Sequence, residues 1–307
     1  MANEIFYSDP AGGPDLLTNG GAVAEVLSGL VAQQLYDTSD LRSVSTFIPY
    51  NTFGSTSMAV TQDAIPGAFG SIAENASVAN TAYTTSEFTL AVSRYSRAYE
   101  ITDLVGIAGS PVDLARAVKN LVDGVSLTFT DLICAATPGF TTQVNAAGPL
   151  DVDDIYDGQF ALNLVANSGP YNCVLHPKQI NEFRNSLRSE AGAMQFQDPT
   201  AEMLATKGPG FQGMWNNIAF YSSDSVTNAA GNHLGAMMSA GALAHTMAPV
   251  SLMQGHVPSS TLIVSTPELL VELSRDAYGA QSAAIAHMYP GVVLAEDARG
   301  VEILSVV

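Results

Sequence analysis

One unbroken apolar stripe, about seven turns of ~3.6 residues, constrains the fold of this chain more than any other feature. It covers residues 111–137, where Ser110 is placed to cap a helix, Pro111 occupies the first helical position and Asp113 complements the helix dipole. Thr137-Pro138-Gly139 then ends the helix. The apolar residues recur at spacings of three and four: Leu114, Val118, Leu121, Val122, Val125, Phe129, Leu132, Ile133 and Ala136. We expect a spine helix packed on a sheet, with a helix bundle as the alternative.

The C-terminal stretch 262–307 supplies a sheet for this helix. It begins as an apolar strand, passes through a helix-compatible or irregular middle, and breaks at Tyr289-Pro290-Gly291. The β-branched run at 292–294 precedes a turn at 296–300, where Gly300 would supply a positive φ, and apolar residues then continue to Val307. The pattern predicts a two-stranded hairpin, so that the chain ends inside a sheet.

Residues 269–276 (LLVELSRD) and 291–301 (GVVLAEDARGV) resemble the closing strands of tailed-phage major capsid proteins, which have the Hong Kong 97-type shell fold. The order of elements extends this resemblance over nearly the whole chain. The resemblance implies an α+β fold with an N-terminal arm at 1–47 and an extended hairpin loop (E-loop) at 48–105. It also implies a peripheral domain at 106–165 and 262–307, which contains the spine helix, and an axial domain at 166–261.

The first part of the chain contains a helical pattern. Val23, Val26 and Leu30 share one face of a predicted helix, for which Asn19 is the expected cap. Such a helix packs either on its own domain or on a neighbour. The resemblance implies an arm that extends over an adjacent subunit.

Two strand patterns between 44 and 101 predict a long hairpin. The first covers 56–65, and the returning strand runs from Phe88 to Ile101 with a shift of apolar phase that indicates a bulge or twist. The stretch between them is rich in Ala, Ser, Asn and Thr, and two long strands without a core need a partner to cover them. We therefore expect the hairpin to lie across a neighbouring subunit. The residues expected to contribute to assembly are Val23, Val26, Leu30, Phe88, Leu90, Val92, Tyr95 and Tyr99.

In some relatives, the family's hairpin loop carries a lysine that bonds covalently to an asparagine of another subunit. The lysines of this chain are Lys119, Lys178 and Lys207, and none lies between 44 and 101. The sequence therefore predicts a non-covalent lattice.

Strands and helices alternate in the region 166–261, which predicts one compact α/β-like unit. Strands are expected at 171–176, 215–222 and 233–239, and helices at 178–189 and 240–247. The stretch 191–213 is punctuated by glycine and proline and is expected to be a loop near a symmetry axis.

Composition limits the possible partners. Only 13% of residues are charged, against ~25% in an average protein, so small polar residues or other copies must cover much of the surface. The net charge of −18 argues against direct binding of nucleic acid, because lysine and arginine must neutralise phosphates. No run approaches the ~20 apolar residues of a membrane span, and the N-terminus lacks a secretion signal. Cys134 and Cys173 are expected to be buried, reduced thiols in a protein made in the cytosol.

No residue pattern predicts catalysis, a metal or a cofactor. Asp151, Asp153, Asp154 and Asp157 match a calcium loop poorly and favour a solvated helix start. No pair among the five histidines has metal-ligand spacing on a helix, and His176, at a strand end, is more typical of a structural histidine.

Three functions remain. The first is a major capsid protein whose copies form hexamers and pentamers of an icosahedral virion shell. This shell would be assembled in the host cytoplasm and would enclose double-stranded DNA without specific binding, with separate scaffolding, portal or decoration proteins as possible partners. The second is an encapsulin-like compartment, and the third is a soluble α/β enzyme acting at the strand end 171–177.

Overall fold

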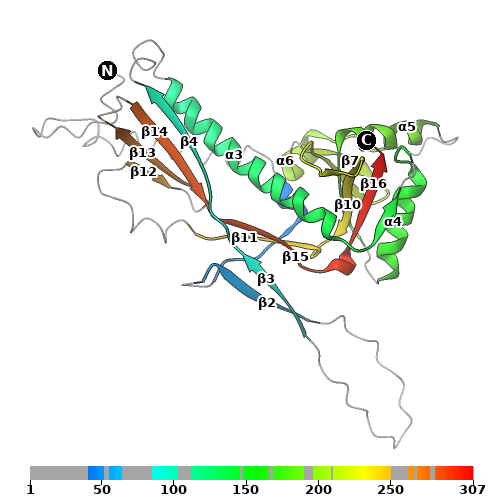
Figure 1. Cartoon of the computed structure of the whole chain (residues 1–307). Coiled ribbons are helices and arrows are strands. Elements are labelled where there is room, and N and C mark those ends of the chain that lie inside the picture. The colour runs from blue at the N-terminus through cyan, green and yellow to red at the C-terminus, as the bar shows by residue number, and fades with distance from the viewer. Residues whose placement is uncertain are drawn as a thin grey trace, which may run out of the picture.

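The computed structural model describes residues 41–51, 55–63, 85–102, 112–145, 148–165, 169–189, 196–208, 210–249, 262–265, 268–276 and 281–306. Figure 1 shows an elongated half and a more compact half that are bridged by one long helix, with a hairpin projecting from the region between them. The predicted arm helix, with Val23, Val26 and Leu30, lies outside the described residues.

The predicted spine helix is confirmed as α3 (Val112–Ala136), which is followed by the 3-10 turn η3 (Thr137–Gly139). Its apolar stripe belongs to two cores. Val122, Val125 and Phe129 pack against the sheet of the elongated half, whereas Ile133 and Cys134 pack into the compact half. One helix therefore ties the two halves together.

The sheet beneath α3 has four antiparallel strands, in the order β12 (Leu262–Ser265), β13 (Leu270–Asp276), β14 (Gln281–Met288) and β4 (Tyr95–Thr102). Val271, Ala284, Ala286 and Met288 face the helix, at the alternation expected of strands with one covered face. The stretch predicted to be helix-compatible or irregular is thus strand β14, because pairing with β13 and β4 along its whole length outweighs its alanine-rich composition.

The compact half is built on a mixed seven-stranded sheet. Six strands follow the order β5 (Gln143–Asn145), β16 (Gly300–Val306), β10 (Asn232–Ser239), β6 (Tyr171–Leu175), β8 (Ile218–Ser222) and β7 (Phe211–Trp215), and β9 (Asn228–Ala229) pairs with β10. Helices α4 (Val152–Leu164) and α5 (Pro177–Ser189) cover one face. The end of α3 and the 3-10 turn η2 (Leu41–Val44) cover the other. Both faces of the sheet are covered, so β6, β8 and β10 are buried almost throughout.

The predicted C-terminal hairpin is wrong. Strand β15 (Pro290–Leu294) pairs with β11 (Leu243–Met247) in a three-stranded sheet that β1 (Thr46–Phe47) completes. Strand β16 instead crosses into the compact half, through the 3-10 turn η6 (Asp297–Arg299). Gly300 is extended, at φ −135°, and is required for another reason: a Cβ there would lie 1.9 Å from a ring carbon of Phe140.

Two further expectations in the compact half need correction. The predicted helix at 240–247 is a turn followed by strand β11, because pairing with β1 and β15 overrides the helix propensity of its alanines and leucine. The predicted strand at 215–222 is the second half of a hairpin, in which Asn216 and Asn217 take positive φ angles of 48° and 62° between β7 and β8. The predicted loop at 191–213 also contains helix α6 (Ala201–Lys207).

Other local predictions are confirmed. Asp151 caps α4 in a reciprocal capping box with Asp154, so this acidic cluster is a helix start. Both cysteines are buried free thiols, and burial raises the pKa of Cys134 to about 11 and that of Cys173 further. No helix within the described part of the chain is long and apolar enough to cross a membrane.

The seven-stranded sheet draws its strands from distant parts of the chain. β16, β5 and α4 come from the ranges expected for the peripheral domain, yet they complete the same sheet and core as β6, β8 and β10. Strand pairing therefore joins the two ranges that sequence order separates.

Candidate assembly surface

A two-stranded antiparallel hairpin projects from the body of the molecule (Figure 1). Its strands, β2 (Ser57–Asp63) and β3 (Thr85–Ala91), are paired from Ser57 opposite Ala91 to Asp63 opposite Thr85. Neither strand pairs with any other strand among the described residues. Most side chains of β3 are exposed, and only Leu90 is fully buried, next to its cross-strand partner Met58. A two-stranded ribbon of this kind has two open backbone edges and little core of its own.

The base of the hairpin is fixed to β15 by backbone contacts. The Ser93 amide donates a hydrogen bond to the Pro290 carbonyl of β15 at 3.1 Å, while the Val92 amide closes the hairpin's own base by donating to the Thr56 carbonyl at 2.9 Å. The chains approach so closely that a Cβ on Gly291 would lie 2.3 Å from the Ala91 carbonyl oxygen. The close contact between the hairpin and β15 therefore requires glycine at position 291.

A polar side-chain contact further along β2 also holds the hairpin. The Gln62 amide nitrogen donates to a carboxylate oxygen of Glu296 at 2.6 Å. Glu296 is also ion-paired with Arg299, whose guanidinium donates to the Ala240 carbonyl at 3.2 Å. These contacts link the hairpin to the turns that begin β11 and β16. Sequence reasoning missed them because Gln62 and Glu296 are 234 positions apart and no local pattern connects them.

The predicted returning strand from Phe88 to Ile101 is two strands. β3 ends at Ala91, and the chain passes through 92–94 into β4, which pairs with β14 in the sheet of the elongated half. The shift in apolar phase therefore marks a change of sheet rather than a bulge. Tyr99 packs against the core beneath α3, while Tyr95 remains 37% exposed.

The residues predicted to contribute to assembly are thus not one surface. Leu90 is buried in its own subunit, Phe88 and Val92 are half-buried at the hairpin, and Tyr95 and Tyr99 belong to the elongated half. The exposed parts of the ribbon are mainly its polar side chains and its backbone edges. The assembly role of these residues stays a prediction.

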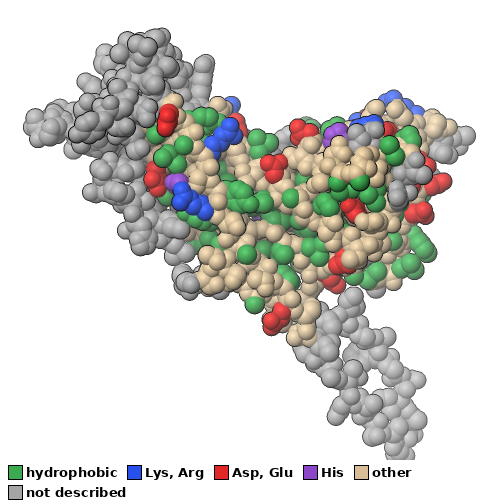
Figure 2. Space-filling view, in the orientation of Figure 1, with side chains coloured by type: hydrophobic (Ala, Val, Ile, Leu, Met, Phe, Trp, Pro, Cys, Tyr) green, Lys and Arg blue, Asp and Glu red, His purple; other side chains and the backbone are tan. Residues whose placement is uncertain are grey.

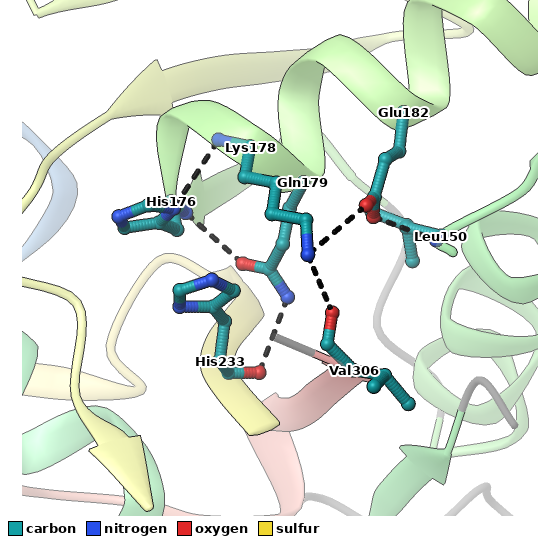
Figure 3. Close-up of polar contacts among 7 residues, drawn as sticks. All are labelled: Leu150, His176, Lys178, Gln179, Glu182, His233 and Val306. Carbon is teal, nitrogen blue, oxygen red and sulfur yellow. Dashed lines mark hydrogen bonds and ion pairs between the residues drawn. The ribbon is translucent and has the colours of Figure 1, made fainter. Parts of the chain in front are cut away.

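The strand end at 171–177, the site of the alternative enzyme hypothesis, is shown in Figure 3. The Nδ1 atom of His176 accepts a hydrogen bond from the Lys178 amide at 3.2 Å, and the His176 amide donates to the Gln179 side chain at 3.0 Å. The imidazoles of His176 and His233 stack with centroids 3.9 Å apart, and burial lowers both pKa values. Neither imidazole hydrogen-bonds to a hydroxyl or thiol in the described part of the chain, so this arrangement starts α5 and joins it to β10.

A second polar group lies on the elongated half. The Oγ atom of Ser96 is 2.7 Å from Nδ1 of His287 and accepts a hydrogen bond from Arg94 at 3.0 Å, and Nε2 of His287 is 3.8 Å from Glu272. Serine, histidine and acid stand in the order of a catalytic triad, but 3.8 Å exceeds a hydrogen-bond distance. The three residues lie on the neighbouring strands β4, β14 and β13, and form a polar row across the sheet. Within the described residues, no three His, Cys, Asp or Glu side chains gather as a metal site.

No protein-family model matches this sequence, and no curated protein matches it significantly. Its fold matches the capsid of Ralstonia phage GP4, with a TM-score of 0.65 and 10% identity over 88% of this chain and 91% of that chain. It matches the capsid of a native GTA particle with a TM-score of 0.62 and 10% identity, covering 89% of this chain and 91% of that one. It also matches the SrpI encapsulin of Synechococcus elongatus, with a TM-score of 0.55 and 12% identity over 86% and 85% of the two chains.

These likenesses extend over most of each chain, at identities of 10–12%. The chain has the Hong Kong 97-type fold of phage capsid subunits, as its sequence predicted.

Proposed function

We propose that this chain is the structural subunit of an icosahedral bacteriophage capsid, which self-assembles into a shell around double-stranded DNA. The projecting hairpin carries this proposal. β2 and β3 leave the body as an isolated ribbon with both edges unpaired among the described residues. Such a ribbon gains stability when it lies on another molecule, and identical subunits supply that surface repeatedly.

The subunit is organised for repetition around the shell. Residues 106–165 and 262–307, with the spine helix, form the peripheral domain, residues 166–261 form the axial domain, and the hairpin and N-terminal arm reach neighbouring copies in hexamers and pentamers. Copies associate without covalent links. The possible partners are separate scaffolding, portal and decoration proteins, and assembly takes place in the host cytoplasm. The subunit has no catalytic role and needs no cofactor.

The net charge of −18 suits containment of DNA better than binding to it. Phosphates are repelled by an acidic wall, so packaged DNA slides past the shell without adhering. This charge gives the proposal a second, independent line of support, although acidity alone also serves solubility.

A shell that stores protein cargo is the second candidate, because the fold also matches that of an encapsulin. The two functions differ in contents rather than in subunit architecture. Sequencing and mass spectrometry of the particle contents distinguish DNA from protein cargo.

The experiment that tests the proposal is electron microscopy of the purified full chain, with sedimentation velocity on the same sample. Closed icosahedral particles, built from hexamers and pentamers, are the expected result. A chain that sediments as a monomer or small oligomer at every concentration, with or without co-expressed phage assembly proteins, contradicts a shell function and favours the soluble enzyme.

A further inference from the structure

Helix α4 carries large apolar side chains on its exposed side as well as on its buried side. Its inner face is buried in the core of the compact half through Val152, Ile155 and Leu162. On the outer face Phe160 and Leu164, four positions apart, are 62% and 70% exposed. Exposed apolar side chains that are grouped together and rimmed by polar residues mark an interaction surface. The outer face of α4 has this composition, since Asp153 and Asp157 lie beside Phe160 and Leu164.

The exposed apolar area has the size of an interface centre rather than of a whole interface. Tyr156 precedes Phe160 by one turn and is itself 37% exposed while its ring contacts Trp215. These three side chains are only part of the ~800 Å² that each partner buries in an ordinary stable interface. An interface with this apolar centre needs a polar and charged rim.

The charges of the compact half are segregated in a way that supplies this rim. Asp153 and Asp157 are exposed on α4 and form no hydrogen bond or ion pair within the described part of the chain. In residues 148–249 the basic side chains all lie on α5 and α6: Lys178, Arg184, Arg188 and Lys207. Figure 2 shows acidic and hydrophobic side chains together on the end of the compact half where α4 lies, and basic side chains along the edge near α5. α5 and α6 also carry Glu182 and Glu202, and Glu182 is 3.8 Å from Lys178, so the cationic end of α5 is formed by Arg188 in its last turn.

Arg188 is the basic residue best placed to contact another molecule. Arg184 already donates to the Gln212 carbonyl at 2.8 Å and stacks on Phe196, and Lys178 donates to the Val306 carbonyl at 3.2 Å. Arg188 lies exposed in the last turn of α5 and makes no such contact among the described residues. Its guanidinium can pair with a carboxylate and also cover an aromatic face.

We infer that the outer face of α4, through Phe160 and Leu164, docks on α5 of a second copy of this chain, with Asp157 opposite Arg188 of that copy. Two different faces of identical subunits meet, so the contact is head-to-tail, the type of contact that forms a ring when the rotation between copies closes. The pairing of opposite charges fixes the register of this contact. A contact between the α4 helices of two copies is disfavoured, because it would bring their aspartates together. The inference rests on the proposed shell function, because in such a shell the neighbours of a subunit are further copies.

The first test removes the apolar centre. In the full chain, Phe160→Ser with Leu164→Ser is compared with Leu127→Ser, which alters another exposed side chain, 57% exposed on α3. Sedimentation velocity should show at least about tenfold less assembled material for the double variant at equal concentration, and an unchanged result for the control. The thermal midpoint of the dissociated subunit should stay unchanged, since these side chains are exposed. A lowered midpoint would show that another part of the same chain covers α4 and would overturn the inference.

The second test identifies the partner surface. Asp157→Arg and Arg188→Asp should each reduce ring formation, and the two together should restore it, because the swapped charges attract again. A double variant no better than the single ones overturns the pairing with α5. If the wild type assembles and Phe160→Ser with Leu164→Ser assembles equally well, the docking is wrong and the shell function stands. If the wild type itself never assembles, both fail.

Discussion

Gln62 on the hairpin and Glu296 before the last strand are joined by a hydrogen bond of 2.6 Å, although 234 positions separate them. The bond sets the direction in which the hairpin leaves the body, because Glu296 is in turn held by Arg299. The hairpin, which we propose reaches a neighbouring subunit, is therefore held in part by the segment between β15 and β16.

Loss of the hydrogen bond between Gln62 and Glu296 should make local opening of the hairpin more frequent without unfolding the subunit. Gln62→Ala removes the donor and should lower the free energy of unfolding by about 1 kcal/mol. Amide hydrogen exchange should become faster in β2 and β3 than in β10 or α3, because opening would be local. Thr61→Ala, at an exposed neighbouring position, is the control and should leave exchange unchanged. Equal exchange in the two variants would show that the hydrogen bond does not hold the hairpin.

Shortening the hairpin should separate folding from assembly. Asp63 and Thr85 are directly opposite each other, so replacement of residues 64–84 by Asn-Gly closes the ribbon with a two-residue turn. The variant should unfold at the same urea concentration as the wild type yet form no shells in the electron microscope. Shells of normal size from this variant would show that the hairpin is not needed for assembly.

Gly300 should tolerate no side chain. In Gly300→Ala the new Cβ would lie 1.9 Å from the Phe140 ring, so the ring or the β16 backbone must move, at a cost of about 1–3 kcal/mol in the free energy of unfolding. Gly124→Ala in α3 is the matched control, because nothing lies within 4 Å of that position and alanine favours a helix. Urea titration should show the first variant destabilised and the second unchanged or more stable. Equal midpoints would contradict the close packing of Phe140 on β16.

His245 should make the subunit sensitive to acid. Burial, with a smaller contribution from Arg42, lowers the pKa of this imidazole from 6.5 to about 4, while Nδ1 lies 2.7 Å from the Ser45 hydroxyl. Between these two values the unfolded chain binds a proton that the folded chain does not, so stability is complete above pH 6.5 and falls as the pH drops toward 4. After allowance for solvent screening, the loss is on the order of 2 kcal/mol.

The measurement for His245 is the free energy of unfolding as a function of pH. His176, His233 and His287 also have lowered pKa values and contribute in the same direction. The wild type is therefore compared with His245→Gln, which cannot take up the proton. The difference between their unfolding free energies should shrink from pH 7 to pH 4. A difference that stays constant would mean that His245 titrates normally.

The assembled lattice should be held by non-covalent contacts alone. Lys178 is engaged with Glu182 and the Val306 carbonyl, and Lys207 lies over the Phe211 ring, both within the subunit. Particles boiled in detergent should therefore run as single-chain bands on a gel. Ladders of linked chains would contradict this prediction.

Elements with strong local signals were predictable. Pro111, Thr137 and the apolar stripe between them define α3, the capping box at Asp151 defines the start of α4, and Pro177 opens α5. The hairpin strands were also predictable, since alternation and a polar connecting stretch are local. The division of the returning strand into β3 and β4 was not predictable, because a change of sheet and a bulge produce the same shift of apolar phase.

The sequence alone determined where the long helix begins and ends and which two segments form the projecting hairpin. Tertiary structure decided the strand partners. In the fold, β16 pairs with β10 and not with β15, and residues 240–247 form a turn and a strand instead of a helix. Both outcomes depend on hydrogen bonds to strands far away in the chain, which no local pattern reports. Tertiary structure also decided that Phe160 and Leu164 lie outside the core, since periodicity reports that a face is apolar and not which molecule covers it.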